Sequence, residues 1–227
     1  MILNGHDLTA LWLTLKLSAL TTAILIIICT PIAWWLARSR WRFKFLLEAL
    51  VALPIVLPPT VLGFYLLLAL GPYGPIGELM KALGGQPLAF TFPGLVIGSV
   101  FYSMPFVIQP LQDAFSSIGR RPLEVAATLR ASPLDRFFTV AMPLAKPGFL
   151  TAAVLGFAHT LGEFGVILMI GGNIPGVTQV ASVAIYDHVD SLEYSQANQL
   201  SAVLLILSFL LLIAVYAFNR RFRVWQQ

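Results

Sequence analysis

Charged residues are scarce in this chain. Of its 227 residues, 11% are Asp, Glu, Lys or Arg, whereas 58% are hydrophobic and the mean hydropathy is +0.85. A soluble domain carries about 25% charged residues, so this chain has too little polar surface to cover a water-exposed globule. The composition therefore excludes an ordinary soluble fold and indicates a membrane protein.

Cysteine is nearly absent as well. The one cysteine, Cys29, lies inside an apolar run, which excludes a disulfide within one chain and a thiolate metal site. We expect Cys29 to be a packing residue. The sequence also lacks the patterns G-x-x-x-x-G-K-[ST] and H-E-x-x-H, and its three histidines are far apart. We therefore predict no catalytic residue, no metal site and no cofactor on this chain.

Five apolar stretches approach the length of about 20 residues that a membrane-crossing helix needs. The start of the chain has neither the basic segment nor the cleavage site of a signal peptide, so we expect the first stretch to be retained. We predict an all-α, polytopic membrane protein with about five transmembrane helices, built as a single domain over residues 1–227. The predicted spans are Leu13–Ala37, Phe45–Leu70, Gly94–Leu111, Phe149–Gly171 and Leu200–Phe218.

The basic residues alternate between the two sides of these spans. Twelve of the 14 Lys and Arg residues fall after spans one, three and five, whereas the loop Gly172–Gln199 contains none. Cytoplasmic loops carry the excess of Lys and Arg, so we predict an N-terminus outside the cell and a cytoplasmic C-terminus. Because these residues are scattered over several loops, the pI near 9.5 does not indicate nucleic acid as a partner. The twelve are Arg38, Arg40, Arg42, Lys44, Arg120, Arg121, Arg130, Arg136, Lys146, Arg220, Arg221 and Arg223.

The cytoplasmic loop at about residues 113–146 contains a charged, amphipathic, helix-prone segment. Pro122 suits the first turn of one short helix, and Ser132 followed by Pro133 suits the N-cap and first turn of a second. We expect the second helix to run until Pro143. Two short helices joined in this way predict a compact projection that enters a groove on a soluble partner.

Two of the predicted spans contain residues that interrupt a helix or are costly in lipid. Leu53–Gly63 holds three prolines, which remove backbone donors and kink the helix. Such broken helices are tolerated where they line a cavity or are covered by protein. Glu163 lies within the fourth span, and an ionisable residue there indicates a functional site. We favour pairing of this carboxylate with Arg or with the backbone, or a gating role, over contact with an anion.

The cytoplasmic segment resembles the ATPase-docking loop of bacterial ABC importer permeases, whose pattern is E-A-A-x3-G-x9-I-x-L-P. Glu124, Ala126, Val140, Met142 and Pro143 match this spacing, and Arg130 stands where the family usually has Gly. The run LPIVLPP and the pairing of GEFG with NIPG resemble the molybdate permeases, a group that also transports sulfate and tungstate. The resemblance extends over nearly the whole chain and implies the MetI-like fold.

The resemblance implies which residues couple the chain to an ATPase. Gly at the position of Arg130 normally allows a positive φ or a close approach, so we expect Arg130 either to change this turn or to pair with a carboxylate of the partner. The coupling residues implied are Glu124, Ala126, Ala127, Leu129, Arg130, Ala131 and Ser132, and the residues packing beneath them are Phe137, Phe138, Val140 and Pro143.

The resemblance also implies partners and a pathway. Two copies would form a homodimer in the inner membrane, two ABC ATPase subunits would hold ATP and Mg, and a periplasmic binding protein would deliver a tetrahedral oxyanion. Rival interpretations are the same architecture carrying sulfate, thiosulfate or tungstate, and a non-transport membrane scaffold or enzyme subunit. The candidate pathway or gate residues are Pro58, Pro59, Thr60, Ser103, Gln109, Thr160, Glu163 and Asn173.

Overall fold

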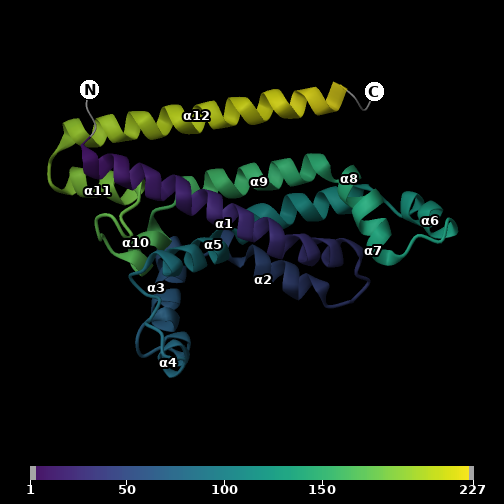
Figure 1. Cartoon of the computed structure of the whole chain (residues 1–227), viewed down its shortest axis with the longest axis horizontal. Helices are drawn as coiled ribbons and strands as arrows, with labels where there is room; N and C mark the ends of the chain where they lie inside the picture. Colours follow the sequence, from purple (N-terminus) through teal and green to yellow (C-terminus); the bar gives the residue numbers. More distant parts are fainter. Residues whose placement is uncertain (1–3, 225–227) are drawn as a thin grey trace.

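The chain folds as an elongated body of helices with a projection at one end (Figure 1). A computed structural model describes the backbone of residues 4–224 and the side chains of residues 4–213. Helical segments account for the regular structure of this part, which confirms the predicted all-α class. They are α1 (Gly5–Arg38), α2 (Lys44–Val56), α3 (Pro59–Leu70), α4 (Pro75–Ala82), α5 (Phe92–Ser117), α6 (Arg121–Thr128), α7 (Pro133–Arg136), the π-helical η1 (Phe137–Ala141), α8 (Met142–Leu144), α9 (Lys146–Leu161), α10 (Gly165–Gly171), α11 (Ala181–Asp190) and α12 (Tyr194–Val224).

Helices α1, α5 and α9 pack against one another and form the centre of the body. Small residues let these helices approach closely, as is usual in membranes. A β-carbon added to Gly156 of α9 would lie 2.6 Å from Val107 of α5. Cys29 is fully buried in this core beside Leu25 and Leu111, which confirms that it is a packing residue.

Most hydroxyl side chains along the buried face of α1 are satisfied within their own helix, whereas the Thr21 hydroxyl has no partner among the described residues. Thr14, Ser18 and Thr22 each donate a hydrogen bond to the carbonyl four residues earlier, over 2.6–2.9 Å. Lipid supplies no hydrogen-bond partners. These hydrogen bonds within α1 therefore allow its hydroxyl side chains to lie in the interior of the helix bundle. The Thr14 hydroxyl also accepts the backbone N–H of Ala181 at 2.8 Å, which ties α11 to α1.

The predicted interruption of the second span is confirmed, but the bounds Phe45–Leu70 are wrong for one membrane-crossing helix. The chain breaks at Leu57–Pro58, and α2, with 13 residues, is too short to cross alone. Figure 1 shows α2 lying along the body and α3 turning away from it. Within the described residues, four helical stretches have the length and hydropathy to cross a membrane, and a fifth results if the bent pair Pro133–Leu144 and Lys146–Leu161 counts as one. The four are Gly5–Arg38, Pro59–Ala82, Phe92–Ser117 and Tyr194–Ile213.

The fourth predicted span is interrupted too. It is divided into α9 and α10 by a break at Gly162–Phe164. By contrast, the third and fifth predicted spans are continuous helices, α5 and α12, each longer than predicted. Helix α5 extends to Ser117, so the projecting segment begins after this residue and not at residue 113.

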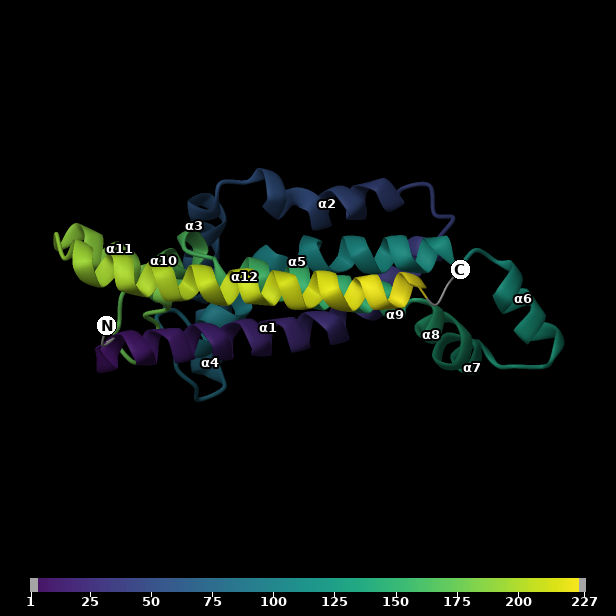
Figure 2. The same cartoon turned by 90° about the horizontal axis from the view of Figure 1, so that it is seen from above.

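The basic loops gather at one end of the molecule. The loop between α1 and α2, the segment α6–α8 and the end of α12 all lie there, opposite the N-terminus (Figures 1 and 2). This arrangement agrees with the predicted alternation of basic residues, and the positive-inside rule makes this end cytoplasmic. The side chains of Arg220, Arg221 and Arg223, which were part of that prediction, lie outside the described residues.

Candidate functional site

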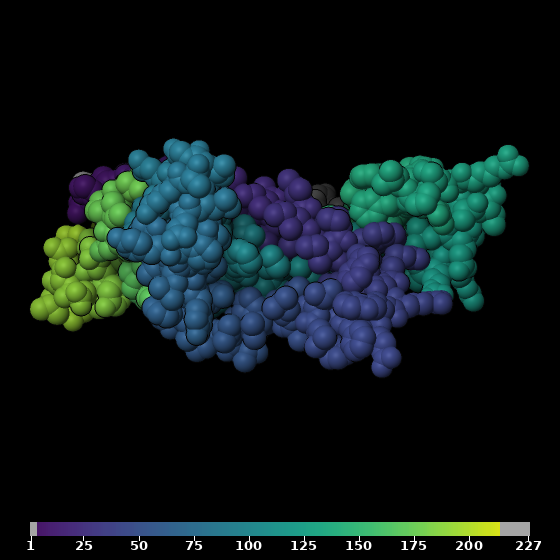
Figure 3. Space-filling model, turned by 90° about the horizontal axis from the view of Figure 1, so that it is seen from below, coloured from purple at the N-terminus to yellow at the C-terminus, as the bar shows by residue number. Residues whose placement is uncertain are grey.

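The segment 121–144, which we call the coupling hairpin, forms a separate projection at the basic end (Figure 3). Its first helix, α6, begins with Pro122 in the first turn, as predicted. The helix ends in a Schellman motif: the N–H of Ala131 bonds to the carbonyl of Ala126 at 3.1 Å, and the N–H of Arg130 to that of Ala127 at 3.0 Å. This motif needs a left-handed residue after the C-cap, and Arg130 supplies it with φ +62°.

We expected Arg130 either to change this turn or to pair with a carboxylate of the partner. The conformation of Arg130 answers the first of these expectations. Arg130 replaces the usual Gly of the resembling family but keeps the positive φ that Gly favours. The turn therefore has the left-handed residue that Gly would favour, and it carries strain, because the left-handed region costs a residue with a β-carbon roughly 1–2 kcal/mol.

The second half of the hairpin starts with the predicted cap. The Ser132 hydroxyl accepts the N–H of Asp135 at 3.2 Å, and Pro133 stands in the first turn of α7. The helix does not end at Pro143 as expected, because the chain continues through η1 into α8, which contains this proline.

An aromatic contact fixes the hairpin to the helix body. The ring of Phe137 lies 5.2 Å from that of Trp34 on α1 and 6.0 Å from that of Phe115 on α5. Phe138 was expected to pack in the same way, but 57% of its surface is exposed and its ring meets only the edge of Phe137 among the aromatic rings described. Phe137 therefore links the hairpin mechanically to two central helices.

The outer surface of the hairpin combines charge with exposed apolar side chains. Glu124, Ala127 and Leu129 are exposed. Val125 and Leu134, which the sequence analysis did not single out, are exposed by 61% and 71%. An apolar surface on a projecting element marks a protein interaction site. The amphipathic composition of the segment was the signal that could have found these two residues.

The two broken helices meet inside the body. A β-carbon added to Gly165, at the start of α10, would lie 2.7 Å from Cβ of Pro59, at the start of α3. Gly63 lies equally close to Met169 one turn further along. Pro59 and Gly165, 106 residues apart in sequence, thus form one contact between the proline break and the glycine break, with no room for an added side chain.

A layer of buried polar groups lies beside this contact. The Ser103 hydroxyl lies 2.9 Å from Thr160 Oγ1 and 2.9 Å from His159 Nδ1. The His159 ring stacks on Phe106 with 3.8 Å between ring centroids. The structure therefore brings together two predicted pathway residues, Ser103 and Thr160, and adds His159, which the sequence analysis did not place among the pathway candidates.

Glu163 occupies the break between α9 and α10. Only 4% of its surface is exposed, and among the described side chains neither carboxylate oxygen has a hydrogen-bond partner of good geometry. The hydroxyl of Ser99, which is buried and equally unpartnered within the described part, lies close to it. The predicted pairing of Glu163 with Arg is not present in the described residues. The side chain of Ser182 donates to the Glu163 carbonyl, which holds this break against α11.

The remaining predicted pathway residues lie elsewhere. Gln109 lines a cavity of about 330 Å³ between α2 and α5, together with Glu48 and Asp113. Thr60 is exposed at the start of α3. Asn173 lies at the outer end, where its amide accepts from Gln179 at 2.7 Å and donates to Asp187 at 2.8 Å. The eight candidates are therefore distributed along the molecule and do not form one site.

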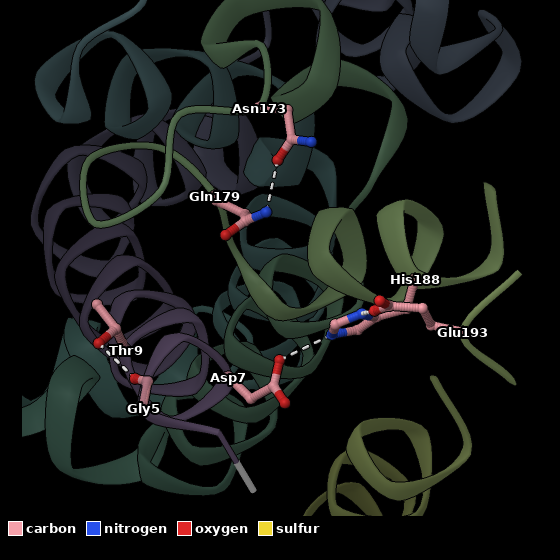
Figure 4. Close-up of polar contacts among 7 residues, drawn as sticks. All are labelled: Gly5, Asp7, Thr9, Asn173, Gln179, His188 and Glu193. Atoms are coloured by element: carbon pink, nitrogen blue, oxygen red, sulfur yellow. Dashed lines mark hydrogen bonds and ion pairs between the residues drawn. The ribbon is translucent and has the colours of Figure 1, made fainter. Parts of the chain in front are cut away.

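A charged cluster joins three segments at the outer end (Figure 4). His188 of α11 lies 2.9 Å from an oxygen of Asp7 on α1 and 3.0 Å from one of Glu193, just before α12. Burial lowers the pKa of His188, but hydrogen bonds and charge from the two carboxylates outweigh burial, so its pKa is raised above the usual value. Neither this cluster nor any other group of three or more His, Cys, Asp or Glu side chains in the described residues is arranged to hold a metal ion.

Comparison with known proteins gives consistent results. Residues 29–224 match the family model described as binding-protein-dependent transport system inner membrane component. The chain is 62% identical over 223 residues to the molybdenum transport system permease protein ModB of Azotobacter vinelandii, with 98% of each chain covered.

Solved structures of low sequence identity share the fold. A bacterial ABC transporter that imports the acidic polysaccharide alginate matches with a TM-score of 0.79 at 16% identity, covering 96% of this chain and 80% of that one. The MetNI methionine ABC transporter, in inward-facing conformations, matches with a TM-score of 0.70 at 16% identity, covering 93% and 94%. These matches confirm the predicted MetI-like fold.

Proposed function

The chain belongs to the family of binding-protein-dependent transport system inner membrane components, and from this premise we propose that it is the permease subunit of an ATP-driven importer of molybdate. The 62% identity to a molybdenum transport permease over nearly the whole chain supports the choice of substrate. The coupling hairpin is the observation that carries the mechanism, because it is a projection with exposed Glu124 and Leu129, anchored in the core through Phe137.

In this proposal the subunit itself performs no chemistry. ATP and Mg are held by a separate ABC ATPase, whose groove receives α6 and the turn at Arg130. The coupling residues are those that the resemblance implied, from Glu124 to Ser132. A periplasmic binding protein delivers the anion at the end that carries Asn173, and two copies of the chain form a homodimer around one pathway. The domain is single, and the hairpin at residues 121–144 is its coupling element.

The transmission path follows the aromatic contacts. Movement of the hairpin displaces Phe137, which rests on Trp34 of α1 and Phe115 of α5. Helix α5 carries Ser103 in the buried polar layer and packs on α9 and α10. Closure of the ATPase therefore acts on the contact between Pro59 and Gly165, which we assign as the gate region together with Pro58 and Glu163.

We expect the anion to bind only weakly along the pathway through the membrane. Moving a dianion into a medium of low dielectric is costly, so the pathway needs water and hydroxyl groups such as those of Thr60, Ser103 and Thr160. Selectivity then rests mainly with the binding protein that delivers the anion.

Uptake by reconstituted proteoliposomes tests this function. The chain is combined with its native ATPase and binding protein, and molybdate uptake is measured with and without ATP. We expect uptake that needs ATP, and we expect Glu124→Arg to lower both uptake and recovery of the ATPase on the purified subunit. Glu78→Arg, which makes the same change on the exposed surface of α4, is the matched control. Equal ATPase recovery by both variants would contradict docking through Glu124.

Competition identifies the anion. Unlabelled molybdate should abolish uptake of labelled molybdate, whereas sulfate and thiosulfate at the same concentration should have little effect. Faster transport of sulfate than of molybdate would assign the chain to the sulfate branch of the group. Tungstate, which has the same charge and shape, is the competitor expected to come nearest to molybdate.

A further inference from the structure

A basic pocket lies at the cytoplasmic end of the body, where α1 and α5 end. It has a volume of about 260 Å³ and is lined by Arg38, Arg40 and Arg120, with the hydroxyls of Ser39 and Ser116 beside them. None of the described residues that line it is acidic. The ion pairs found among the described residues involve Lys44 and His188 and none of these arginines. The pocket thus concentrates positive charge. Glu124 on α6 is near enough for its charge to act on Arg38, but no described carboxylate forms an ion pair with the pocket arginines.

One of the three arginines is held in place by an aromatic ring. The guanidinium of Arg38 lies 4.8 Å from the ring centre of Trp34, which precedes it by one turn on the same face of α1. Trp34 in turn packs edge-on against Phe115, a buried residue that forms part of the pocket lining. An arginine fixed in this way loses little side-chain freedom when it binds a phosphate.

Exposed aromatic rings place this pocket at the level of lipid headgroups. Trp35 and Trp41 lie 6.2 Å apart and Trp41 and Phe43 lie 5.9 Å apart, and each of the three is more than 40% exposed. Tryptophan rings of this kind gather at the interface between membrane and water. Basic pockets between helices on the cytoplasmic side are where anionic headgroups bind.

A separate apolar groove is lined by the same tryptophan and extends from it toward the membrane interior. It has a volume of about 680 Å³ and lies between α1 and the coupling hairpin. Its lining includes Ile27, Pro31 and Trp34 of α1 and Leu134, Phe138 and Met142 of the hairpin. Ile27 lies two turns deeper along α1 than Trp34, so the groove runs in the direction that an acyl chain would take below its headgroup.

We propose that Arg38, Arg40 and Arg120 bind the phosphate of an anionic phospholipid from the cytoplasmic leaflet, and that the apolar groove takes one of its acyl chains. The charge of the pocket selects the headgroup. The groove selects a lipid over a free oxyanion, because it reaches Trp34, which packs on Arg38 and Phe115 of the pocket. A lipid bound there joins the end of α1 to the hairpin. The proposal depends neither on the transported anion nor on an ATPase, so it can fail while the transport function stands.

Binding of phosphatidylglycerol to the purified full chain tests the proposal. The delipidated protein in neutral detergent is titrated with phosphatidylglycerol and, separately, with zwitterionic phosphatidylcholine. We compare the wild type with the double variant Arg38→Gln, Arg120→Gln. The matched control is Arg42→Gln, which removes the same charge from an arginine that stacks on Phe43 outside the pocket.

The double variant should bind phosphatidylglycerol about thirtyfold more weakly, since each basic residue near a headgroup contributes about 1 kcal/mol and 1.4 kcal/mol is tenfold. The control should change the affinity little. Phosphatidylcholine should bind weakly to all three proteins, and a short-chain phosphatidylglycerol should bind the wild type more weakly than the long-chain lipid.

Four results would overturn the proposal. The first is an unchanged affinity of the double variant for phosphatidylglycerol. The second and third are a wild-type affinity for phosphatidylcholine, or for the short-chain lipid, equal to that for long-chain phosphatidylglycerol. The fourth is displacement of the lipid by inorganic phosphate at similar concentration, which would indicate a free oxyanion site. If the double variant does not fold, Arg38→Lys keeps the charge but loses the planar stack on Trp34. It should lower the affinity severalfold, and an unchanged affinity would contradict the role of Arg38.

Discussion

Replacing Gly165 by alanine perturbs the contact between the two broken helices directly. The added β-carbon would lie 2.7 Å from Cβ of Pro59, a distance that side-chain carbons do not adopt. The proline ring is rigid and cannot rotate away, so either α3 or α10 must shift. Gly162, three residues earlier in the same break, offers a matched control, because there the only atom within 4 Å of an added β-carbon is the Ala158 carbonyl oxygen at 3.8 Å.

The expected cost of Gly165→Ala follows from this overlap. Inserting a methyl group into a packed interior costs about 1–3 kcal/mol. For a chain of this length each kcal/mol lowers the unfolding midpoint by about 2–4 °C, so we expect a decrease of about 2–12 °C. Gly162→Ala should leave the midpoint within about 2 °C of the wild type, because a contact at 3.8 Å is an ordinary one.

Two assays on the same preparations separate stability from gating. The thermal unfolding midpoint in detergent measures the packing cost, and ATP-dependent molybdate uptake in proteoliposomes measures the gate. We expect Gly165→Ala to reduce uptake at a temperature where the protein remains folded, whereas Gly162→Ala transports normally. Equal uptake and equal midpoints for the two variants would refute the close contact between the breaks.

Three further predictions concern the hairpin and the outer cluster. Arg130→Gly should stabilise the hairpin by about 1 kcal/mol, since glycine adopts the left-handed conformation without strain, and hydrogen exchange of the α6 amides should slow; faster exchange would contradict the observed turn. Ser132→Ala should remove the cap of α7 and cost about 0.5–2 kcal/mol, seen as faster exchange at Asp135, whereas Ser132→Asp should restore protection. The raised pKa of His188 means that its ion pairs with Asp7 and Glu193 stabilise the fold fully below the unfolded pKa of about 6.5 and are lost as pH rises through the folded value. The difference in unfolding midpoint between wild type and His188→Gln should therefore shrink from pH 5.5 to pH 9. A difference that grows with pH would contradict a raised pKa of His188.

The positions of single helices were largely predictable because their signals are local. The uninterrupted apolar run of the last span became α12, and Ser132 with Pro133 specified the start of α7 through chemistry within four residues. The spacing pattern also located the turn at Arg130. The positive φ of Arg130 could be inferred only from the Gly that the resembling family has at this position. Arginine itself has no preference for the left-handed conformation.

The contacts between helices were not predictable, because the sequence contains no measure of distance between segments. Nothing in the run around Pro59 indicates that it meets Gly165, and nothing near Ser103 indicates a bond to His159, 56 residues away. The break in the second span was predictable, because the three prolines of Leu53–Gly63 are a local signal. The direction that α3 takes after the break was not, because it depends on packing against α10.

A cross-link between the coupling hairpin and an ATPase measures the central claim most directly. Ala127 is exposed on α6, and the one native cysteine, Cys29, is fully buried, so Ala127→Cys places a single accessible thiol on the hairpin. In native membranes a thiol-reactive cross-linker should join this residue to the ABC ATPase subunit. Cross-linking of position 127 to the periplasmic binding protein, with none to the ATPase, would contradict the account.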